Sequence, residues 1–314
     1  MKIVIPYDVG IPEGYNQRLR DLGAEVYEGP RPDRSEFIRR LKKAEIFVAN
    51  ISDRVSEVID EAKDLKYLIL LAAGYETINL SRLREAGITV VTCPIYSAQA
   101  VAEQAIALFF AVARKIVLAN QSLKAGEWRV EDFEGTEIAG KKVGLIGHGN
   151  VGKKIEKLVA GLGAGAVHVN SKSASEDIDS LISGSDIVIV CAALTPATKH
   201  LIDARRLGLF KRGAILINVS RGSIIDQLAL YEVLKTGKIS AGLDVYENEP
   251  SGGKMATDPP NQAIMKLAKL PNVVATPHIA FNTKEALDRL GEEIIVNIQA
   301  CLKGQPINVA GEHV

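Results

Sequence analysis

Val143-Gly-Leu-Ile-Gly-His-Gly-Asn-Val-Gly152 is an apolar run that ends in three glycines spaced Gly-x-Gly-x-x-Gly, near the middle of the 314-residue chain. In such a turn Gly147 permits a tight bend, Gly149 lets the backbone approach a ligand, and Gly152 lets the following helix pack close to its strand. The helix N-terminus supplies amide groups and partial positive charge. The pattern therefore predicts a site for a nucleotide pyrophosphate.

The residues after the glycines decide between a binding loop and a plain turn, because short glycine patterns are common in a chain with 27 glycines. Apolar residues recur at helical spacing, at Ile155, Leu158, Val159 and Leu162. Residues 166–169 then have the composition of a second strand. This order of strand, glycine turn, helix and strand favours dinucleotide binding over a structural turn.

The composition excludes several classes of partner. Lys plus Arg and Asp plus Glu both number 38, so the formal net charge is zero and nothing favours binding to nucleic acid or to an anionic membrane. No apolar run reaches the roughly 18 residues that span a bilayer, and the N-terminus enters a strand directly, without a signal-peptide pattern. We expect a soluble cytoplasmic protein of about two domains.

The cysteines and histidines show no metal-ligand spacing. Cys93, Cys191 and Cys301 lie far apart and form no C-x-x-C pair, so buried free thiols are expected rather than a disulfide or metal site. None of the five histidines belongs to an H-E-x-x-H or comparable pattern. No metal is predicted.

Apolar strand-like segments alternate with charged helical segments over the first 93 residues. The expected strands are residues 3–7, 25–27, 46–50, 67–71 and 89–93. Such alternation predicts a parallel sheet covered on both faces. Leu71-Ala-Ala-Gly-Tyr75 is a small-residue turn after one of these strands, where ligands of open α/β sheets tend to bind.

A second alternating unit begins at Lys142, after a long helix expected over about 98–119. Its expected strands are residues 143–146, 166–170, 187–191, 214–219, 240–245 and 273–276. Six strands match one dinucleotide-binding domain with two mononucleotide halves. A final helix over about 283–302 would carry the chain back to the first domain.

The expected fold class is α/β, with two doubly wound parallel-sheet domains. A Rossmann dinucleotide-binding domain, residues 96–284 with the linking helix, is inserted into a flavodoxin-like substrate-binding domain. The substrate-binding domain is therefore discontinuous and consists of residues 1–95 and 285–314.

Three ionisable residues follow strands of the second unit: Arg221 after the 214–219 strand, Glu249 after the 240–245 strand and His278 after the 273–276 strand. The carboxyl ends of parallel strands lie along one edge, so these residues are predicted to converge on one crevice. Singly, each could be an ordinary surface or salt-bridge residue.

The three side chains suit hydride transfer at a carbon beside a carboxylate. His278 can protonate the developing alkoxide near neutral pH, and Glu249 would favour and orient its imidazolium form. Arg221 offers a planar fork to the carboxylate or carbonyl oxygen. The backbone amides of Ala73 and Gly74 could hold the other side of that carboxylate.

These residues lie in motifs that resemble those of the D-isomer-specific 2-hydroxyacid dehydrogenases over nearly the whole chain. The motifs are Ala72-Ala-Gly-Tyr75, Val101-Ala-Glu103, Gly126-Glu-Trp128, Gly147-His-Gly-Asn-Val-Gly152, Leu194-Thr-Pro196, Asn218-Val-Ser-Arg-Gly222, Asp244-Val-Tyr-Glu-Asn-Glu-Pro250 and Thr276-Pro-His-Ile-Ala280. The resemblance implies that Arg221 binds substrate and that Glu249 pairs with His278. It also implies a cytoplasmic homodimer with a hinge between the two domains.

The resemblance implies a nicotinamide cofactor, with Asp244 accepting from the carboxamide. The residues expected to line the nucleotide are Gly147, Gly149, Asn150, Val151, Gly152, Asn170, Ser171, Lys172, Pro196, Thr198, Val219, Ser220, Asp244, His278 and Ala280.

The end of the second strand bears on the choice of cofactor. An acidic residue there normally accepts from the ribose hydroxyls of NAD, but this chain has Asn170, eighteen residues after Gly152 (170 − 152), followed by Ser171 and Lys172. Hydroxyls and a cation suit a 2′-phosphate, so NADP is preferred. NAD is the alternative, with Lys172 a solvated loop lysine.

Two departures from the family pattern bear on structure. Residues 171–184 form a short connection between the second and third strands, which predicts an open adenine side. Asn79 stands where the family has aspartate after the substrate turn, and we interpret it as a surface or helix-capping change.

The leading hypothesis is a glyoxylate/hydroxypyruvate reductase. The alternatives are an NAD-dependent D-3-phosphoglycerate dehydrogenase or related D-2-hydroxyacid dehydrogenase, and a non-catalytic, nucleotide-sensing protein like some co-repressors. The presence of Arg221, Glu249 and His278 disfavours the non-catalytic protein. A methyltransferase would need none of the three.

Overall fold

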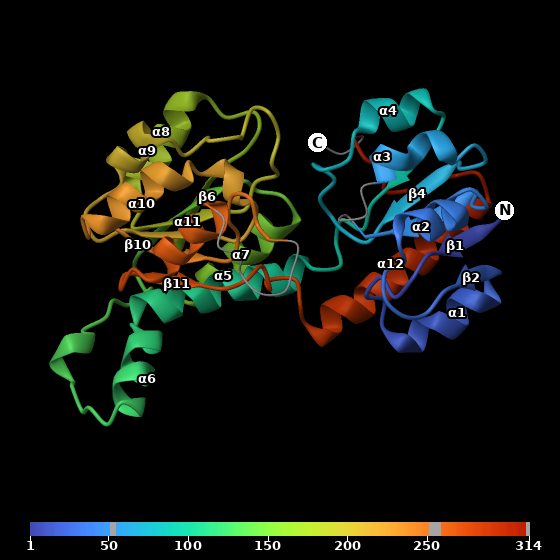
Figure 1. Ribbon diagram of the computed structural model, residues 1–314. Coiled ribbons are helices and arrows are strands. Elements are labelled where there is room, and N and C mark those ends of the chain that lie inside the picture. Colours follow the sequence, from blue (N-terminus) through green and yellow to red (C-terminus); the bar gives the residue numbers. More distant parts are fainter. Residues whose placement is uncertain (51–54, 251–258, 312–314) are drawn as a thin grey trace. The chain divides into compact units, whose positions relative to one another are not determined.

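The computed structural model describes residues 1–50, 55–250 and 259–311 (Figure 1). The chain divides into two compact units, Met1–Ser97 with Asn282–Val314, and Ala98–Phe281. These boundaries fall within three residues of those expected from the sequence. The binding roles assigned to the two domains stay predictions.

The first unit contains a five-stranded parallel sheet. Its strands are β1 (Ile3–Ile5), β2 (Ala24–Val26), β3 (Ile46–Ala49), β4 (Tyr67–Leu70) and β5 (Thr89–Val91), in the order β2-β1-β3-β4-β5. This is the flavodoxin-like strand order, and every strand lies where the sequence predicted one. Ala73 and Gly74 follow the carboxyl end of β4, next to a backbone hydrogen bond from Cys93 N to Ala72 O (2.9 Å).

The helices of the first unit are α1 (Asn16–Asp21), α2 (Arg34–Leu41), α3 (Val55–Val58), α4 (Leu80–Glu85) and α12 (Lys284–Leu302). Three of the helices in the described part of the first unit, α2, α4 and α12, begin at a side chain that caps them. Asn79 Oδ1 accepts from Arg82 N (3.1 Å) at the start of α4, which confirms its predicted capping role. Thr283 Oγ1 caps α12 in the same way, at 3.2 Å from Ala286 N.

The end of the chain belongs to the first unit, as the sequence predicted. Helix α12 buries Leu290, Ile294 and Ile298 and packs against β4. Beyond it, Val309 forms an antiparallel bridge with Val91 in β5. The first unit is therefore completed by a segment that begins 191 residues after its last strand (282 − 91).

The second unit contains a six-stranded parallel sheet. Its strands are β6 (Lys142–Ile146), β7 (Gly165–Val169), β8 (Ile187–Val190), β9 (Ile215–Asn218), β10 (Ser240–Leu243) and β11 (Val273–Ala275), in the order β11-β10-β9-β8-β6-β7. All six predicted strands are present. Within the described residues β7 is an edge strand, because the short 171–184 connection holds one helix and no strand before the chain enters β8.

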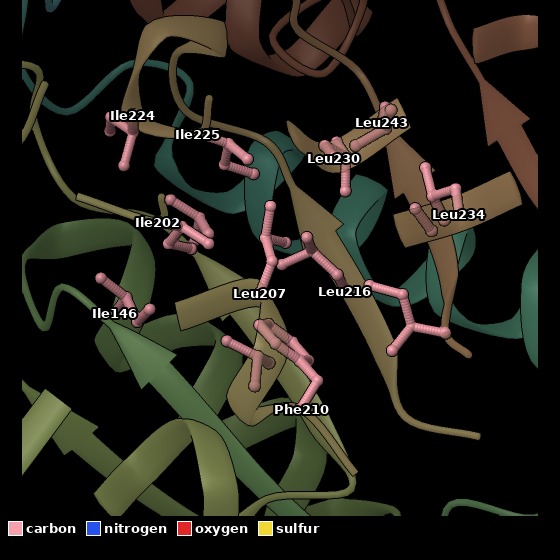
Figure 2. Close-up of a cluster of buried hydrophobic side chains, with 14 of the residues drawn as sticks. Ile146, Ile202, Leu207, Phe210, Leu216, Ile224, Ile225, Leu230, Leu234 and Leu243 are labelled. Carbon is pink, nitrogen blue, oxygen red and sulfur yellow. The ribbon is translucent and has the colours of Figure 1, made fainter. Parts of the chain in front are cut away.

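Helices cover both faces of this sheet: α5 (Ala98–Ala113), α7 (Asn150–Gly161), α8 (Ser175–Gly184), α9 (Ala204–Leu209), α10 (Gln227–Lys235) and α11 (Pro259–Ala268). Helix α6 (Ile116–Lys124) packs on α5 and buries none of its side chains. On one face Leu216 of β9 and Leu243 of β10 pack with Leu207 of α9 and Leu230 of α10 (Figure 2). On the other, Leu145 and Ile217 pack with residues of α5 and α7. Burying each such side chain stabilises the fold by roughly 1.5–3 kcal/mol.

The prediction of a single linking helix over 98–119 is wrong. Helix α5 ends at Ala113, and α6 begins at Ile116 after Lys115, whose φ of 50° is left-handed. Tertiary contacts hold this break: Lys115 Nζ donates to Asp132 O (3.0 Å), and Ala113 O accepts from Thr136 N (2.9 Å). Neither glycine nor proline marks the break in the sequence.

The three cysteines are free. Cys93 and Cys301 are buried as expected, but Cys191 is only half-buried. No helix in the part of the chain that the structure describes is both long enough and apolar enough to cross a membrane.

Candidate active site

The glycine turn after β6 is shaped by close backbone contacts. A Cβ atom on Gly147, which has φ 102°, would lie 2.6 Å from Ala192 N, and one on Gly152 would lie 2.6 Å from Gly147 O. Cys191 Sγ, at the end of β8, lies 3.1 Å from Gly147 O, to which the thiol donates. A Cβ on Gly149 would meet nothing within 4 Å. The turn is therefore rigid at its two ends and open at Gly149.

Helix α7 begins at Asn150 with its first amides available. In the described structure no side chain caps Gly149 at the start of the helix, and the first turn contains no acidic residue. Because helix N-termini carry unpaired N–H groups and partial positive charge, the amides of Asn150, Val151 and Gly152 can receive an anion. These residues fit the pyrophosphate of a dinucleotide.

The three ionisable residues follow three neighbouring strands. Arg221 follows β9, Glu249 follows β10 and His278 follows β11, and these strands lie side by side in the order β11-β10-β9. The structure therefore brings all three loops to one sheet edge, as the alternation of the sequence predicted. Their catalytic roles stay predictions.

His278 and Glu249 form a direct pair. The His278 Nδ1 atom lies 2.6 Å from Glu249 Oε2, and Glu249 Oε1 accepts from the Tyr246 backbone N (2.8 Å). The carboxylate is thus fixed at both oxygens and fixes the ring. Engagement of Nδ1 leaves Nε2 to face a reactant, and the side chain of His278 is 40% exposed.

The backbone of His278 has a left-handed conformation, with φ 51°. Such a conformation is uncommon outside glycine and is held here by the surrounding structure, since His278 N donates to Asp244 O (2.8 Å). The fully buried Asp244 carboxylate accepts from Thr276 Oγ1 (2.5 Å), Ile279 N (3.0 Å) and Ala280 N (2.9 Å). Asp244 therefore organises the histidine loop, and its predicted contact with the carboxamide stays a prediction.

Asn218, at the end of β9, shapes the arginine loop. This residue is 1% exposed; its Nδ2 donates to Arg221 O (3.1 Å) and its Oδ1 accepts from Ser220 N (3.1 Å). The half-buried Arg221 also donates from Nη1 to Ser220 O (2.8 Å). Sequence reasoning quoted Asn218 within a motif but gave it no role.

Tyr246 is a second positioning residue that the sequence did not reveal. Its hydroxyl lies 3.0 Å from Leu243 O and 3.2 Å from Thr276 O, which ties the β10 loop to the β11 loop. Burial raises the pKa of Tyr246 far above its usual range, so the hydroxyl stays a neutral donor. The only signal was an aromatic residue directly after an apolar strand.

The loop after β7 is closed by Asn170. Its Oδ1 accepts from Lys172 N (2.9 Å), and its backbone N donates to Ser173 Oγ (3.1 Å). Ser171 and Lys172 are exposed, and no described residue pairs with the Lys172 ammonium. Asn170 therefore shapes the loop, while Ser171 and Lys172 are accessible.

The remaining predicted nucleotide residues lie in loops at the same edge. After β8, Thr198 Oγ1 donates to Ala193 O (2.7 Å) and accepts from Thr195 N (2.7 Å), and Pro196 is exposed. Val219 and Ala280 are buried. Ala73 and Gly74 lie in the other unit, and their predicted contact with substrate stays a prediction.

Comparisons with known proteins show which family this chain resembles. Residues 106–280 match the family model described as D-isomer specific 2-hydroxyacid dehydrogenase, NAD binding domain. A glycerate dehydrogenase from Methylorubrum extorquens is 35% identical over 283 residues, covering 87% of this chain and 88% of the relative. A D-3-phosphoglycerate dehydrogenase from Archaeoglobus fulgidus is 38% identical over 304 residues, covering 93% of this chain. This chain spans only 56% of that relative's length.

A solved structure of the same architecture is that of an acyclic imino acid reductase in complex with NADPH and D-Arg. It superposes with a TM-score of 0.87 at 31% identity, covering 98% of this chain and 99% of that chain. The matches extend over both units. The chain therefore belongs to the D-isomer-specific 2-hydroxyacid dehydrogenase family and is an NAD(P)-dependent enzyme of that family.

Proposed function

We propose that this enzyme reduces small, unphosphorylated 2-keto acids to D-2-hydroxy acids, with glyoxylate and hydroxypyruvate as the leading substrates. The observation that carries the proposal is the pair of His278 Nδ1 and Glu249 Oε2, 2.6 Å apart, in the loops next to that of Arg221. The pair leaves Nε2 of His278 to donate a proton to the substrate, and Arg221 supplies a cation that can bind the substrate's carboxylate.

The proposed reaction adds a hydride and a proton across the carbonyl at carbon 2. The nicotinamide cofactor supplies the hydride when it is bound. The His278 Nε2–H donates the proton to the oxygen that becomes the hydroxyl, and Glu249 stabilises the imidazolium before transfer. Arg221 orients the substrate through its carboxylate, so the same face of the carbonyl is always presented.

The charges around these loops favour a substrate without phosphate. Besides the proton donor His278, residues 219–226, 244–250 and 276–281 contain one basic side chain, Arg221, against four carboxylates, Asp226, Asp244, Glu247 and Glu249. A phosphate adds about two negative charges at neutral pH and would require further cations in these segments. This supports hydroxypyruvate over its phosphorylated counterpart.

A panel of 2-keto acids tests the substrate class. Glyoxylate, hydroxypyruvate, pyruvate and 3-phosphohydroxypyruvate are assayed with NADPH and with NADH, following loss of absorbance at 340 nm. We expect kcat/KM for glyoxylate or hydroxypyruvate to exceed that for the phosphorylated acid by at least about tenfold. A preference for 3-phosphohydroxypyruvate would overturn the proposal.

We also propose a preference for NADP over NAD. The support is the loop after β7, where residues 170–174 contain no carboxylate and the exposed Lys172 stands beside Ser171. A carboxylate there would repel a 2′-phosphate, whereas an ammonium and hydroxyls can bind it.

Lys172→Glu is expected to lower the ratio of kcat/KM for NADPH to that for NADH by at least about tenfold, since one charge-assisted hydrogen bond is lost and a repulsion is added. Steady-state kinetics with both cofactors measure the ratio. Lys157→Glu is the matched control, an exposed lysine on α7 away from the loop. A wild-type preference for NADH would contradict the proposal.

A homodimer is the proposed assembly. Its support is an exposed apolar surface along α6 and the segment after it, formed by Ile116, Leu123, Trp128 and Val130. Trp128 is 83% exposed, and monomeric proteins rarely leave such surfaces open. Light scattering is expected to give twice the chain mass of 33.8 kDa, and a monomer mass would contradict it.

A further inference from the structure

Two histidines and a glutamate from three elements of the second unit meet on one face of its sheet. They are His148 in the glycine turn, Glu156 in α7 and His168 in β7. One ligand atom from each lies within 4.8 Å of the others. The sequence predicted no metal ligands because these residues are spaced eight and twelve apart (156 − 148, 168 − 156), a spacing that only the strand–turn–helix–strand fold brings together.

We propose that His148, Glu156 and His168 bind one divalent transition-metal ion of the zinc type. Imidazole nitrogen with a single carboxylate is a donor set that Zn²⁺ and Co²⁺ prefer over Mg²⁺ or Ca²⁺. Three protein ligands leave a fourth position for water. The site lies on the α7 face of the sheet, beside the glycine turn, and takes no part in the proton transfer assigned to His278.

Glu156 lies beside both rings and contacts a nitrogen atom of each. Its Oε2 lies 2.8 Å from His148 Nε2, and its Oε1 lies 3.8 Å from His168 Nδ1. The hydrogen bond from His148, with a smaller contribution from His168, lowers the pKa of Glu156. The carboxylate is therefore ionised and available as a ligand near neutral pH.

The two rings are stacked, with centroids 3.6 Å apart and planes within 4° of parallel. An ion bound to both rings lies in the plane of each, so one ring must tilt out of the stack. His168 is the ring that can move, because it lies on the edge strand β7 and its side chain is 37% exposed. The His148 side chain is only 17% exposed and stays beside α7.

A bound ion would join the two rings and the carboxylate. It would also link the glycine turn to α7 and β7, so its binding is expected to raise the Tm of the protein without cofactor.

The test uses the full chain, freed of metal with a chelator and without cofactor. Co²⁺ is titrated and followed by its visible absorption, with Zn²⁺ as competitor. We expect one equivalent of Co²⁺ to bind, Zn²⁺ to displace it, and the Tm to rise. His168→Gln and Glu156→Gln, both at partly exposed positions, are each expected to weaken binding by at least about tenfold.

The matched control is His200→Gln. His200 Nε2 lies 2.5 Å from Glu247 Oε1, so this variant removes a similar His–Glu pair that belongs to no described three-ligand group. Its affinity for Co²⁺ should equal that of the wild type. The proposal is overturned if no Co²⁺ binds below millimolar concentration, or if binding survives His168→Gln and Glu156→Gln but is lost in His278→Gln.

Discussion

Replacing His278 with alanine is expected to lower kcat for 2-keto acid reduction by about 10²- to 10⁴-fold, the usual contribution of a positioned acid. No other group replaces the proton donor in this variant. The two oxygens of Glu249 are engaged by His278 Nδ1 and by the Tyr246 backbone N, so this carboxylate is not placed to protonate the substrate. Steady-state kinetics at saturating cofactor measure the loss.

Two further variants separate catalysis from folding. Glu249→Gln should lower kcat less than His278→Ala does, because the ring keeps its proton donor but loses its charged partner. His200→Ala, in a His–Glu pair outside the proposed mechanism, should retain wild-type kcat. Full activity in His278→Ala, at an unchanged Tm, would refute the acid–base assignment.

Arg221→Gln is expected to lower kcat/KM by about 10²-fold or more, since each hydrogen bond to a charged group contributes about 1.5–3 kcal/mol. Much of the loss should fall on KM, because the guanidinium is proposed to bind the substrate carboxylate before the reaction and throughout it. Kinetics with the best 2-keto acid measure both constants.

Arg221→Lys should recover only part of that loss, because lysine keeps the charge but not the planar fork. Arg205→Gln is the control: Arg205, whose side chain is 56% exposed, pairs with Asp179 (2.6 Å) between α9 and α8. An unchanged KM in Arg221→Gln would show that another cation binds the carboxylate.

The strands were predictable because strands that are buried on both faces of a sheet are continuous apolar segments in the sequence. Residues 187–190 read Ile-Val-Ile-Val, and all four are buried in β8. Such continuous apolar runs, separated by helical spacing, are characteristic of a covered parallel sheet. Because the carboxyl ends of parallel strands share one edge, the convergence of Arg221, Glu249 and His278 followed from the same pattern.

The features that the sequence did not reveal depend on partners distant along the chain. The break at Lys115 is held by Asp132 and Thr136, and local propensity favoured a continuous helix. The Asp244 carboxylate accepts a hydrogen bond from the backbone amide of Ala280, which lies 36 residues further along the chain. The spacing of His148 and His168 likewise predicts no contact between them unless β6 and β7 are known to be neighbouring strands.

The thiol that holds the glycine turn has a consequence for the protein under oxidative stress. Burial raises the pKa of Cys191 to about 12, so the thiolate is a very minor species at pH 7. Peroxides and alkylating agents react with thiolates, and the neutral thiol already donates to Gly147 O. Cys191 is thus expected to react slowly, and oxidants that disable low-pKa cysteines should leave this nucleotide loop largely unmodified.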